Sequence, residues 1–213
     1  MPLRNKRSGN VVIEFALTFT LMVPLLLGTV GAGLTMSRSI QVTQVARDTG
    51  RLYYQGVDLS TSANQKIVGR LAYGMGLASD ANGTINTSGR GVVIVSKLLK
   101  IGTAECANGG FSGGLIGACT NNGLLVVVRR IVIGNASLRT SAFGSPGSGI
   151  ILSDGTINAS DYCTSNTVLV PGGATAQSLG LTAGQYTFAT EAFFTTPELS
   201  GFFANQAYAT NLF

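Results

Sequence analysis

A run of 23 residues from Phe15 to Ser37 carries no charge, and it constrains this chain more than any other feature. A helix rises about 1.5 Å per residue, so a helix of this length spans the roughly 30 Å hydrocarbon core of a bilayer. The apolar core of a secretory signal has only about 7 to 15 residues, and no clear A-x-A cleavage site follows this run. The sequence therefore predicts a retained membrane-spanning helix.

Three basic residues in a short N-terminal tail predict the orientation of this helix. Arg4, Lys6 and Arg7 precede the run, and the positive-inside rule keeps such a tail in the cytoplasm. Everything after the helix is then expected outside the cytoplasm. The other basic residues are scattered singly or in pairs. We therefore interpret the net charge of +5 as a signal for membrane orientation and not for nucleic-acid binding.

Proline and glycine inside the run depart from a plain anchor. Pro24 removes one backbone donor and is expected to kink the helix or open it locally. Gly28, Gly31 and Gly33 leave a thin surface that another helix could approach closely. The alternative is that glycine and proline are simply commoner in membrane helices than in soluble ones.

The residues just before the run form a more specific pattern. A basic stretch over residues 1–8 is followed by Gly9, four neutral residues, Glu14 and Phe15. This pattern resembles the prepilin signal of type IV pilins. The longer stretch "GNVVIEFALTFTLMVPLLLG", with "VTQVARDTGRLYYQG" after it, resembles the TadE-like pilins and pseudopilins of Tad pili. The resemblance extends to about residue 56.

This resemblance implies a processing site and an assembly role. A prepilin peptidase would cut after Gly9, so that the mature chain begins at Asn10 with Glu14 as its fifth residue. Glu14 would then pair with the new α-amino group of the same or an adjacent subunit, which offsets the burial of its carboxylate. The alternatives are a leader that stays attached, and an ordinary signal anchor with Glu14 at headgroup level. The expected assembly residues are Glu14, Phe15, Pro24 and Gly28.

Secondary structure after the run is expected to change from helix to strands. The first helix continues past Ser37 as an interrupted apolar stripe, and a second helix is predicted from about Ser60 to Ala78. Three runs rich in β-branched or aromatic residues are predicted strands, the first two as central partners. Asp154 and Gly155 predict a hairpin turn. The C-terminal residues 197–213 are left open between a helix, a strand and a segment completed by a neighbour. The predicted strands are residues 91–102, 123–134 and 185–196.

The expected fold class is α+β, with a long N-terminal hydrophobic helix, an antiparallel β-rich globular domain and a second short helix. The expected organisation is a basic prepilin-like leader over residues 1–9, a transmembrane and assembly helix over residues 10–57, and an extracytoplasmic β-rich domain over residues 58–213. A chain of 213 residues is long enough for one such domain beside the helix.

Three cysteines lie beyond the apolar run, where export permits a disulfide. Cys106 and Cys119 flank a glycine-rich loop, and we expect them to be bonded. A bond between Cys119 and Cys163 is the alternative. The spacing lacks the paired C-x2-C clusters of a zinc site, so no metal is expected.

Catalytic chemistry is not expected. The chain has no histidine, which removes the usual general base and metal ligand. It also lacks an S-x-x-K motif and a phosphate-binding loop. No cofactor, small-molecule substrate or nucleic acid is therefore expected. Two carboxylate pairs, each seven residues apart, are interpreted as solvated surface groups: Glu191 with Glu198, and Asp154 with Asp161.

The resemblance implies a structural function. The chain is expected to polymerise through its N-terminal helix into a Tad or type IV-like extracellular filament, as a minor pilin or as the main subunit. Its expected partners are itself, other pilins, the membrane before assembly, a prepilin peptidase and the assembly machinery. It would start in the inner membrane with its C-terminal domain outside the cytoplasm. The alternative is a monomeric signal-anchored binding or adhesion protein, whose tether would tolerate Glu14→Ala.

Overall fold

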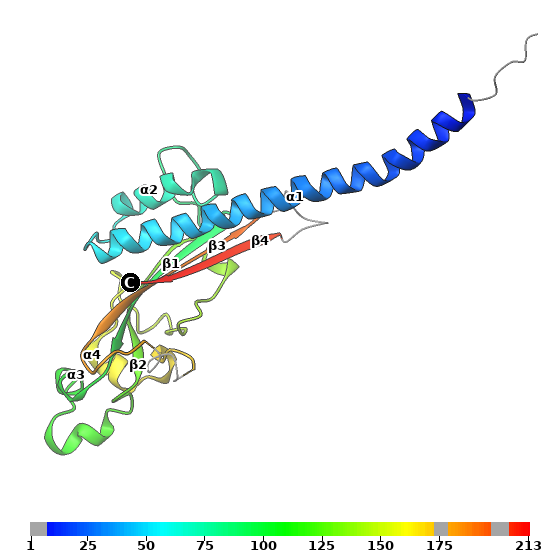
Figure 1. Ribbon diagram of the computed structural model, residues 1–213. Helices are drawn as coiled ribbons and strands as arrows, with labels where there is room; N and C mark the ends of the chain where they lie inside the picture. Colours follow the sequence, from blue (N-terminus) through cyan, green and yellow to red (C-terminus); the bar gives the residue numbers. More distant parts are fainter. Residues whose placement is uncertain (1–7, 173–178, 197–204) are drawn as a thin grey trace, which may run out of the picture.

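One helix dominates the shape of the molecule. The structure is a computed structural model that describes residues 8–172, 179–196 and 205–213. The helix α1 (Ser8–Tyr54) is 47 residues long, and its N-terminal half projects beyond the rest of the chain (Figure 1). It is continuous through Pro24 and curves smoothly along the projecting half. The missing backbone donor is thus accommodated without a break.

The rest of the chain is built on a four-stranded sheet. Its strands are β1 (Gly91–Lys100), β2 (Leu125–Gly134), β3 (Tyr186–Thr195) and β4 (Gln206–Leu212). They run in the order β2-β1-β3-β4, and every neighbouring pair is antiparallel. The predicted α+β class is confirmed.

The three predicted strands are all present, and β1 pairs with β2 as expected. Only β1 is central, however, because β3 pairs with its other side and leaves β2 at an edge of the sheet. The prediction that both are central was wrong. The burial pattern agrees with this, since Val132 on β2 is 40% exposed whereas its partner Ile94 on β1 is 4% exposed.

The C-terminal half of α1 packs on one face of the sheet. Residues three and four apart on a helix share a face, and the buried residues of this half follow that spacing: Val42, Val45, Ala46, Thr49 and Tyr53. The apolar ones, all except Thr49, share one hydrophobic core with Val93, Val95, Ala192 and Phe194 of the sheet. Full burial of each large apolar side chain contributes about 1.5–3 kcal/mol, so this core fixes α1 to the domain.

Gly50 allows α1 to lie unusually close to β3 and to the C-terminus. A Cβ atom at this position would overlap the ring of Phe213 and lie 2.8 Å from Thr190 Oγ1. Phe213 is tied down in turn, because its backbone exchanges hydrogen bonds of 3.0 and 2.9 Å with Phe188. The end of the chain is therefore fitted against the helix.

Replacing Gly50 by alanine is expected to lower the free energy of unfolding by about 1–3 kcal/mol, the usual effect of overpacking. Helix propensity alone predicts the opposite, a gain of about 1 kcal/mol. Gly74→Ala is the matched control, because nothing lies within 4 Å of a Cβ atom there. A urea titration of the full chain in detergent measures both variants. Equal or higher stability of Gly50→Ala would contradict the packing described here.

The second helix is shorter than the sequence predicts. It comprises α2 (Ser62–Leu71), followed by a single 3-10 turn, η1 (Tyr73–Met75). The predicted end at Ala78 was wrong because Gly76 adopts a left-handed conformation with φ of 84° and terminates the turn. The helix covers the outer side of α1 (Figure 1).

Short helical turns cover the other end of the sheet and enclose a second hydrophobic cluster. They are α3 (Thr103–Asn108), η2 (Gly113–Ala118), α4 (Ala159–Thr164) and η4 (Asn166–Val168). The turn η3 (Ala136–Leu138) follows β2 and belongs to a third cluster, in which Leu138 packs against Val92, Ile94 and Phe193. The predicted hairpin is reduced to one bridge between Ile151 and Ile157 around Gly155, which has φ of 85°. The C-terminal segment is a strand, β4, from Gln206, while residues 197–204 lie outside the described residues.

Candidate functional site

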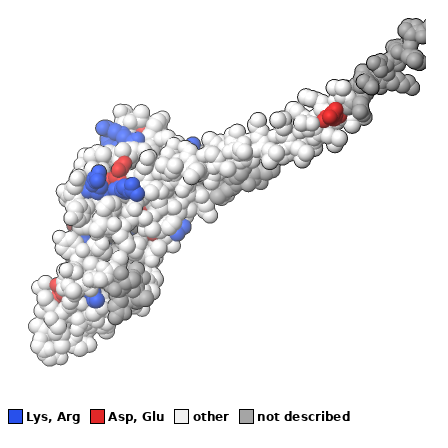
Figure 2. All heavy atoms as spheres, viewed as in Figure 1, with Lys and Arg blue, Asp and Glu red and all other residues white. Residues whose placement is uncertain are grey.

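The projecting half of α1 is apolar on all sides and uncovered. Its large apolar side chains between Val11 and Leu34 are 36–71% exposed. Among the described residues, α1 is the helix that is long and apolar enough to cross a membrane. Figure 2 shows this half almost without charge. A helix that is hydrophobic all round requires lipid or protein around it.

The predicted assembly residues all lie along this half. Glu14 is exposed and makes no ion pair with any residue of the described segments. The rings of Phe15 and Phe19 stack with centroids 5.9 Å apart. Nothing lies within 4 Å of a Cβ atom at Gly28, so a second helix could approach its backbone there. Pro24 occupies the middle of the same uncovered stretch.

The predicted processing site lies at the start of α1. Gly9 and Asn10 belong to its first turn. The leader residues 1–7, with all three basic residues of the tail, lie outside the described residues.

The three cysteines come together at the far end of the sheet. Cys106 and Cys119 form a disulfide, and Cys163 is free and buried. The three sulfur atoms lie within 4.8 Å of one another. Because two of them are bonded to each other, only the thiol of Cys163 could act as a metal ligand among these three cysteines. Gly109 makes room for that thiol, because a Cβ atom there would lie 2.8 Å from Cys163 Sγ. Burial raises the pKa of the Cys163 thiol, and the charge of Glu105 adds to this effect.

Removing the disulfide is expected to lower the free energy of unfolding by about 3 kcal/mol, the loop-closure value for a separation of this size. Cys163 is close enough to replace a lost partner, so the comparison is made in a Cys163→Ser background. Cys163→Ser alone is the control, and the double variant Cys106→Ser/Cys163→Ser lacks the bond. Urea titration measures both. If the two titrate alike, the bond adds nothing to the domain.

Glu191 is not the solvated group that the sequence predicted. It lies on β3 on the face opposite α1 and is 2% exposed. Its carboxylate accepts hydrogen bonds from the Ser141 hydroxyl, from the Ala142 backbone N–H at 2.9 Å and from the Tyr208 hydroxyl at 2.8 Å. The segment from 139 to 144 folds over this strand and satisfies the carboxylate. Of the other carboxylates interpreted as solvated, Asp154 is exposed, Asp161 is half-buried and Glu198 lies outside the described residues.

A buried guanidinium accompanies this carboxylate. Arg130 on β2 is 7% exposed and donates hydrogen bonds to the Ser96 hydroxyl and to the carbonyl oxygens of Phe143 and Gly144. Burial lowers the pKa of Arg130 to about 10, while the charge of Glu191 opposes that shift. Both charges fasten the same covering segment to the sheet, so we interpret them as structural groups.

Stability is expected to fall in alkaline solution through groups whose pKa is raised in the fold. Burial raises the pKa of Tyr208, and the hydrogen bond to Glu191 adds to the shift; the pKa of Cys163 is raised in the same direction. Such groups contribute their full stability below their unfolded pKa and lose it as the pH rises through the folded value. Arg130 works in the opposite direction, because its folded pKa is the lower one.

We therefore expect the free energy of unfolding to decline above about pH 8.5, where a free thiol and then tyrosine begin to ionise. Tyr208→Phe should make the decline between pH 9 and 11 shallower, apart from any change at neutral pH. Urea titrations across this range measure the slope. A wild-type protein whose stability stays constant, or a variant with an unchanged slope, would contradict this assignment.

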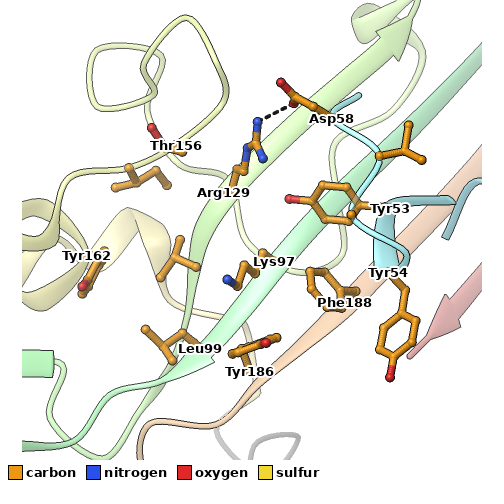
Figure 3. Close-up of a pocket in the computed structure, with 14 residues that line it drawn as sticks. Tyr53, Tyr54, Asp58, Lys97, Leu99, Arg129, Thr156, Tyr162, Tyr186 and Phe188 are labelled. Carbon is orange, nitrogen blue, oxygen red and sulfur yellow. Dashed lines mark hydrogen bonds and ion pairs between the residues drawn. The ribbon is translucent and has the colours of Figure 1, made fainter. Parts of the chain in front are cut away.

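An aromatic groove lies where the sheet extends beyond the end of α1 (Figure 3). On the face that carries the α1 core, Lys97 is in register with Arg129 and Phe188, and Leu99 is in register with Tyr186. These positions follow Val95 in the same alternation, but α1 ends before it can cover them. They line a groove of about 620 Å³ together with the end of α1 and residues 56–58.

Sequence reasoning missed this groove because its residues come from distant parts of the chain. The strands did contain a hint of the groove, because Lys97 and Tyr186 occupy alternate positions that elsewhere hold core residues. This hint can be interpreted only when the end of α1 relative to the sheet is known. The same applies to Glu191, whose cover comes from a segment about 50 residues away.

Comparison with known proteins identifies the long helix. Residues 9–51 match the family model described as TadE-like protein, which confirms the resemblance drawn from the sequence. This family is a structural, pilus-associated one. Neither a curated protein nor a solved structure matches the chain.

Proposed function

We propose that this chain, whose residues 9–51 are a TadE-like segment, is a pilin-like subunit that enters a Tad or type IV-like extracellular filament through its N-terminal helix. The observation that carries this proposal is the division of α1 into two halves. The C-terminal half is buried against the sheet. The N-terminal half carries large apolar side chains on all sides, and each of them is 36–71% exposed. One continuous helix thus joins an apolar segment that suits a membrane to a folded domain.

Polymerisation would replace the lipid around the projecting half of α1 with protein. Before assembly, lipid surrounds the projecting half, with the domain from about residue 58 outside the cytoplasm. After extraction, helices of neighbouring subunits would surround it, and the open backbone at Gly28 supports close helix packing. The leader, residues 1–9, would be removed by a prepilin peptidase. The assembly machinery and other pilins would be the remaining partners.

Glu14 would set the stagger between subunits. It is the charged residue of an otherwise uncharged stretch, and within the described segments it has no ionic partner. A carboxylate in an apolar bundle requires a counter-charge, and cleavage after Gly9 would supply one as the α-amino group of Asn10. The proposed function covers both a minor pilin and the main filament subunit.

The second candidate is a monomeric, membrane-anchored binding protein. The open groove beyond α1, of about 620 Å³, favours it, because a pure building block needs no such recess. In that case α1 would only tether the domain and the projecting half would remain in lipid.

Site-specific photo-crosslinking in cells tests the choice. A benzophenone amino acid replaces Phe19, which is 57% exposed on the projecting half, and the matched control replaces Leu152, which is 48% exposed in the β-rich part. A filament subunit should give crosslinked products from position 19 in sheared surface material. The main subunit would give a ladder of multiples of its own mass, and a minor pilin would give adducts with other pilins. A chain that remains monomeric at position 19 and stays with the membrane would support the tether instead.

A further inference from the structure

The groove beyond the end of α1 combines ring faces with a small number of polar groups. Its right-hand side in Figure 3 carries Tyr53, Tyr54 and Phe188, and Tyr162 lies on the opposite side. Tyr53 and Tyr54 pack edge-on against Phe188, with ring centroids 5.1 and 5.9 Å apart. Tyr186 packs in the same way against Phe188 at 5.5 Å. The four rings therefore form one packed cluster around Phe188.

Much of this aromatic surface remains in contact with solvent. Tyr54 is 63% exposed and Tyr186 is 54% exposed. A volume of about 620 Å³ lies within the roughly 300–1,000 Å³ typical of small-molecule sites, which are lined by apolar groups with a few polar ones that fix orientation. The electron-rich face of an aromatic ring attracts positively polarised hydrogens. The C–H faces of a sugar ring present such hydrogens, and its hydroxyl groups suit the polar rim.

The charges of the groove leave one cation without an anion. Arg129 Nη2 lies 2.7 Å from Asp58 Oδ1, so these two groups largely neutralise each other. Lys97 Nζ lies 4.2 Å from the centre of the Tyr186 ring and 6.0 Å from that of Phe188. Among the described residues it makes no ion pair and no hydrogen bond. Its ammonium group therefore has three donors available for one incoming anionic group.

Two other classes of ligand fit less well. Single-stranded nucleic acid requires a basic track along its phosphates, whereas this groove has one cation that is not neutralised. An extended peptide would bind best to an open strand edge. The groove lies on the face of the sheet over β1, which is paired on both sides.

We propose that this groove binds a carboxylate-bearing glycan. Lys97 receives the carboxylate, and the rings of Tyr186 and Phe188 pack against the sugar. Tyr53 and Asp58 lie where they can bond to hydroxyl groups. This site is separate from the projecting half of α1, so it does not depend on whether the chain forms a filament.

Binding is tested on the full chain in detergent micelles by saturation-transfer NMR and calorimetry. The probes are a trigalacturonate, a trimannuronate and 3′-sialyllactose, each compared with its methyl ester, which removes the charge and keeps the sugar. We expect at least one acid to bind and its ester to bind at least about tenfold more weakly, the change that about 1.4 kcal/mol produces.

Variants separate the two parts of the site. Lys97→Gln should reduce binding of the acid to the level of the ester, and Lys97→Arg should retain the preference for the acid. Tyr186→Ala should weaken acid and ester alike. Lys66→Gln, on α2 and away from the groove, is the control and should change nothing. The Cys106–Cys119 disulfide and the circular dichroism spectrum of each variant verify that it is folded.

Three results would overturn the proposal. The first is that no acid binds at millimolar concentration. The second is that acids and esters bind equally well to the wild type. The third is that an oligo-dT strand or an acidic peptide of equal charge binds more tightly than every sugar. Photo-crosslinking from position 19 is unaffected by all of these, so failure here is distinguishable from failure of the proposed function.

Discussion

Glu14→Gln is expected to reduce the amount of this protein in sheared surface filaments at least about tenfold, while the amount in the membrane stays the same. Glutamine keeps the shape and removes the charge. In a filament the variant would leave the α-amino group of a neighbouring chain unpaired among apolar helices, and breaking a buried ion pair in this way costs about 3–5 kcal/mol. In lipid, before assembly, the same substitution removes a charge from the edge of the run and costs nothing comparable.

The measurement is immunoblotting of sheared and membrane fractions, with the N-terminus of the membrane-held chain determined to keep cleavage separate from assembly. Asp48→Asn is the matched control, because Asp48 is an exposed carboxylate on the domain-packed half of the same helix. A Glu14→Gln variant that reaches the surface at the wild-type level would show that this charge is dispensable, as expected for a tether.

Glu191→Ala is expected to lower the free energy of unfolding by about 3–5 kcal/mol, because each donor that loses its acceptor in a buried site costs about 1–3 kcal/mol. The substitution leaves the Ser141 hydroxyl, the Ala142 backbone N–H and the Tyr208 hydroxyl without their acceptor. It also leaves the Arg130 guanidinium, 7% exposed, without the one nearby negative charge that favours its ionised form. The segment over β3 should then detach first.

Urea titration of the full chain in detergent measures this effect, and proteolysis of the segment from 139 to 144 locates it. Glu191→Gln separates charge from hydrogen bonding, because the amide retains an acceptor and should be less damaging than alanine. The exposed Asp48→Asn serves as the surface reference, with an expected change within about 0.5 kcal/mol. A Glu191→Ala variant as stable as the wild type would mean that the buried charges contribute no stability.

The elements with a strong local pattern were predictable from the sequence. The uncharged run and the stripe that continues to Tyr53 predicted one long helix, and α1 ends at Tyr54. The β-branched run that begins at Gly91 predicted β1 within two residues of its observed end at Lys100. The aromatic alternation after Gln185 predicted β3. In each case the pattern repeats over ten residues or more, so tertiary contacts reinforce it.

The groove and the burial of Glu191 could not be predicted, because they depend on where helices and loops end relative to the sheet. The length of α1 relative to the sheet decides that Val95 is buried and that Lys97, two residues later, faces a groove. The charge of Glu191 suggested solvent, but it occupies the middle of β3 beneath a segment with no regular pattern. The helix α2 stops at Leu71, and the left-handed Gly76 ends the 3-10 turn that follows it, although apolar positions continue beyond, because backbone conformation overrode periodicity.

The most direct test of the central claim is the intact mass and N-terminal sequence of this protein in material sheared from the cell surface. The proposed function predicts chains that begin at Asn10 in a fraction that sediments as filaments. Chains that begin at Met1 in that fraction would contradict cleavage after Gly9. A protein found wholly in the membrane fraction would contradict assembly itself, and α1 would then be a tether.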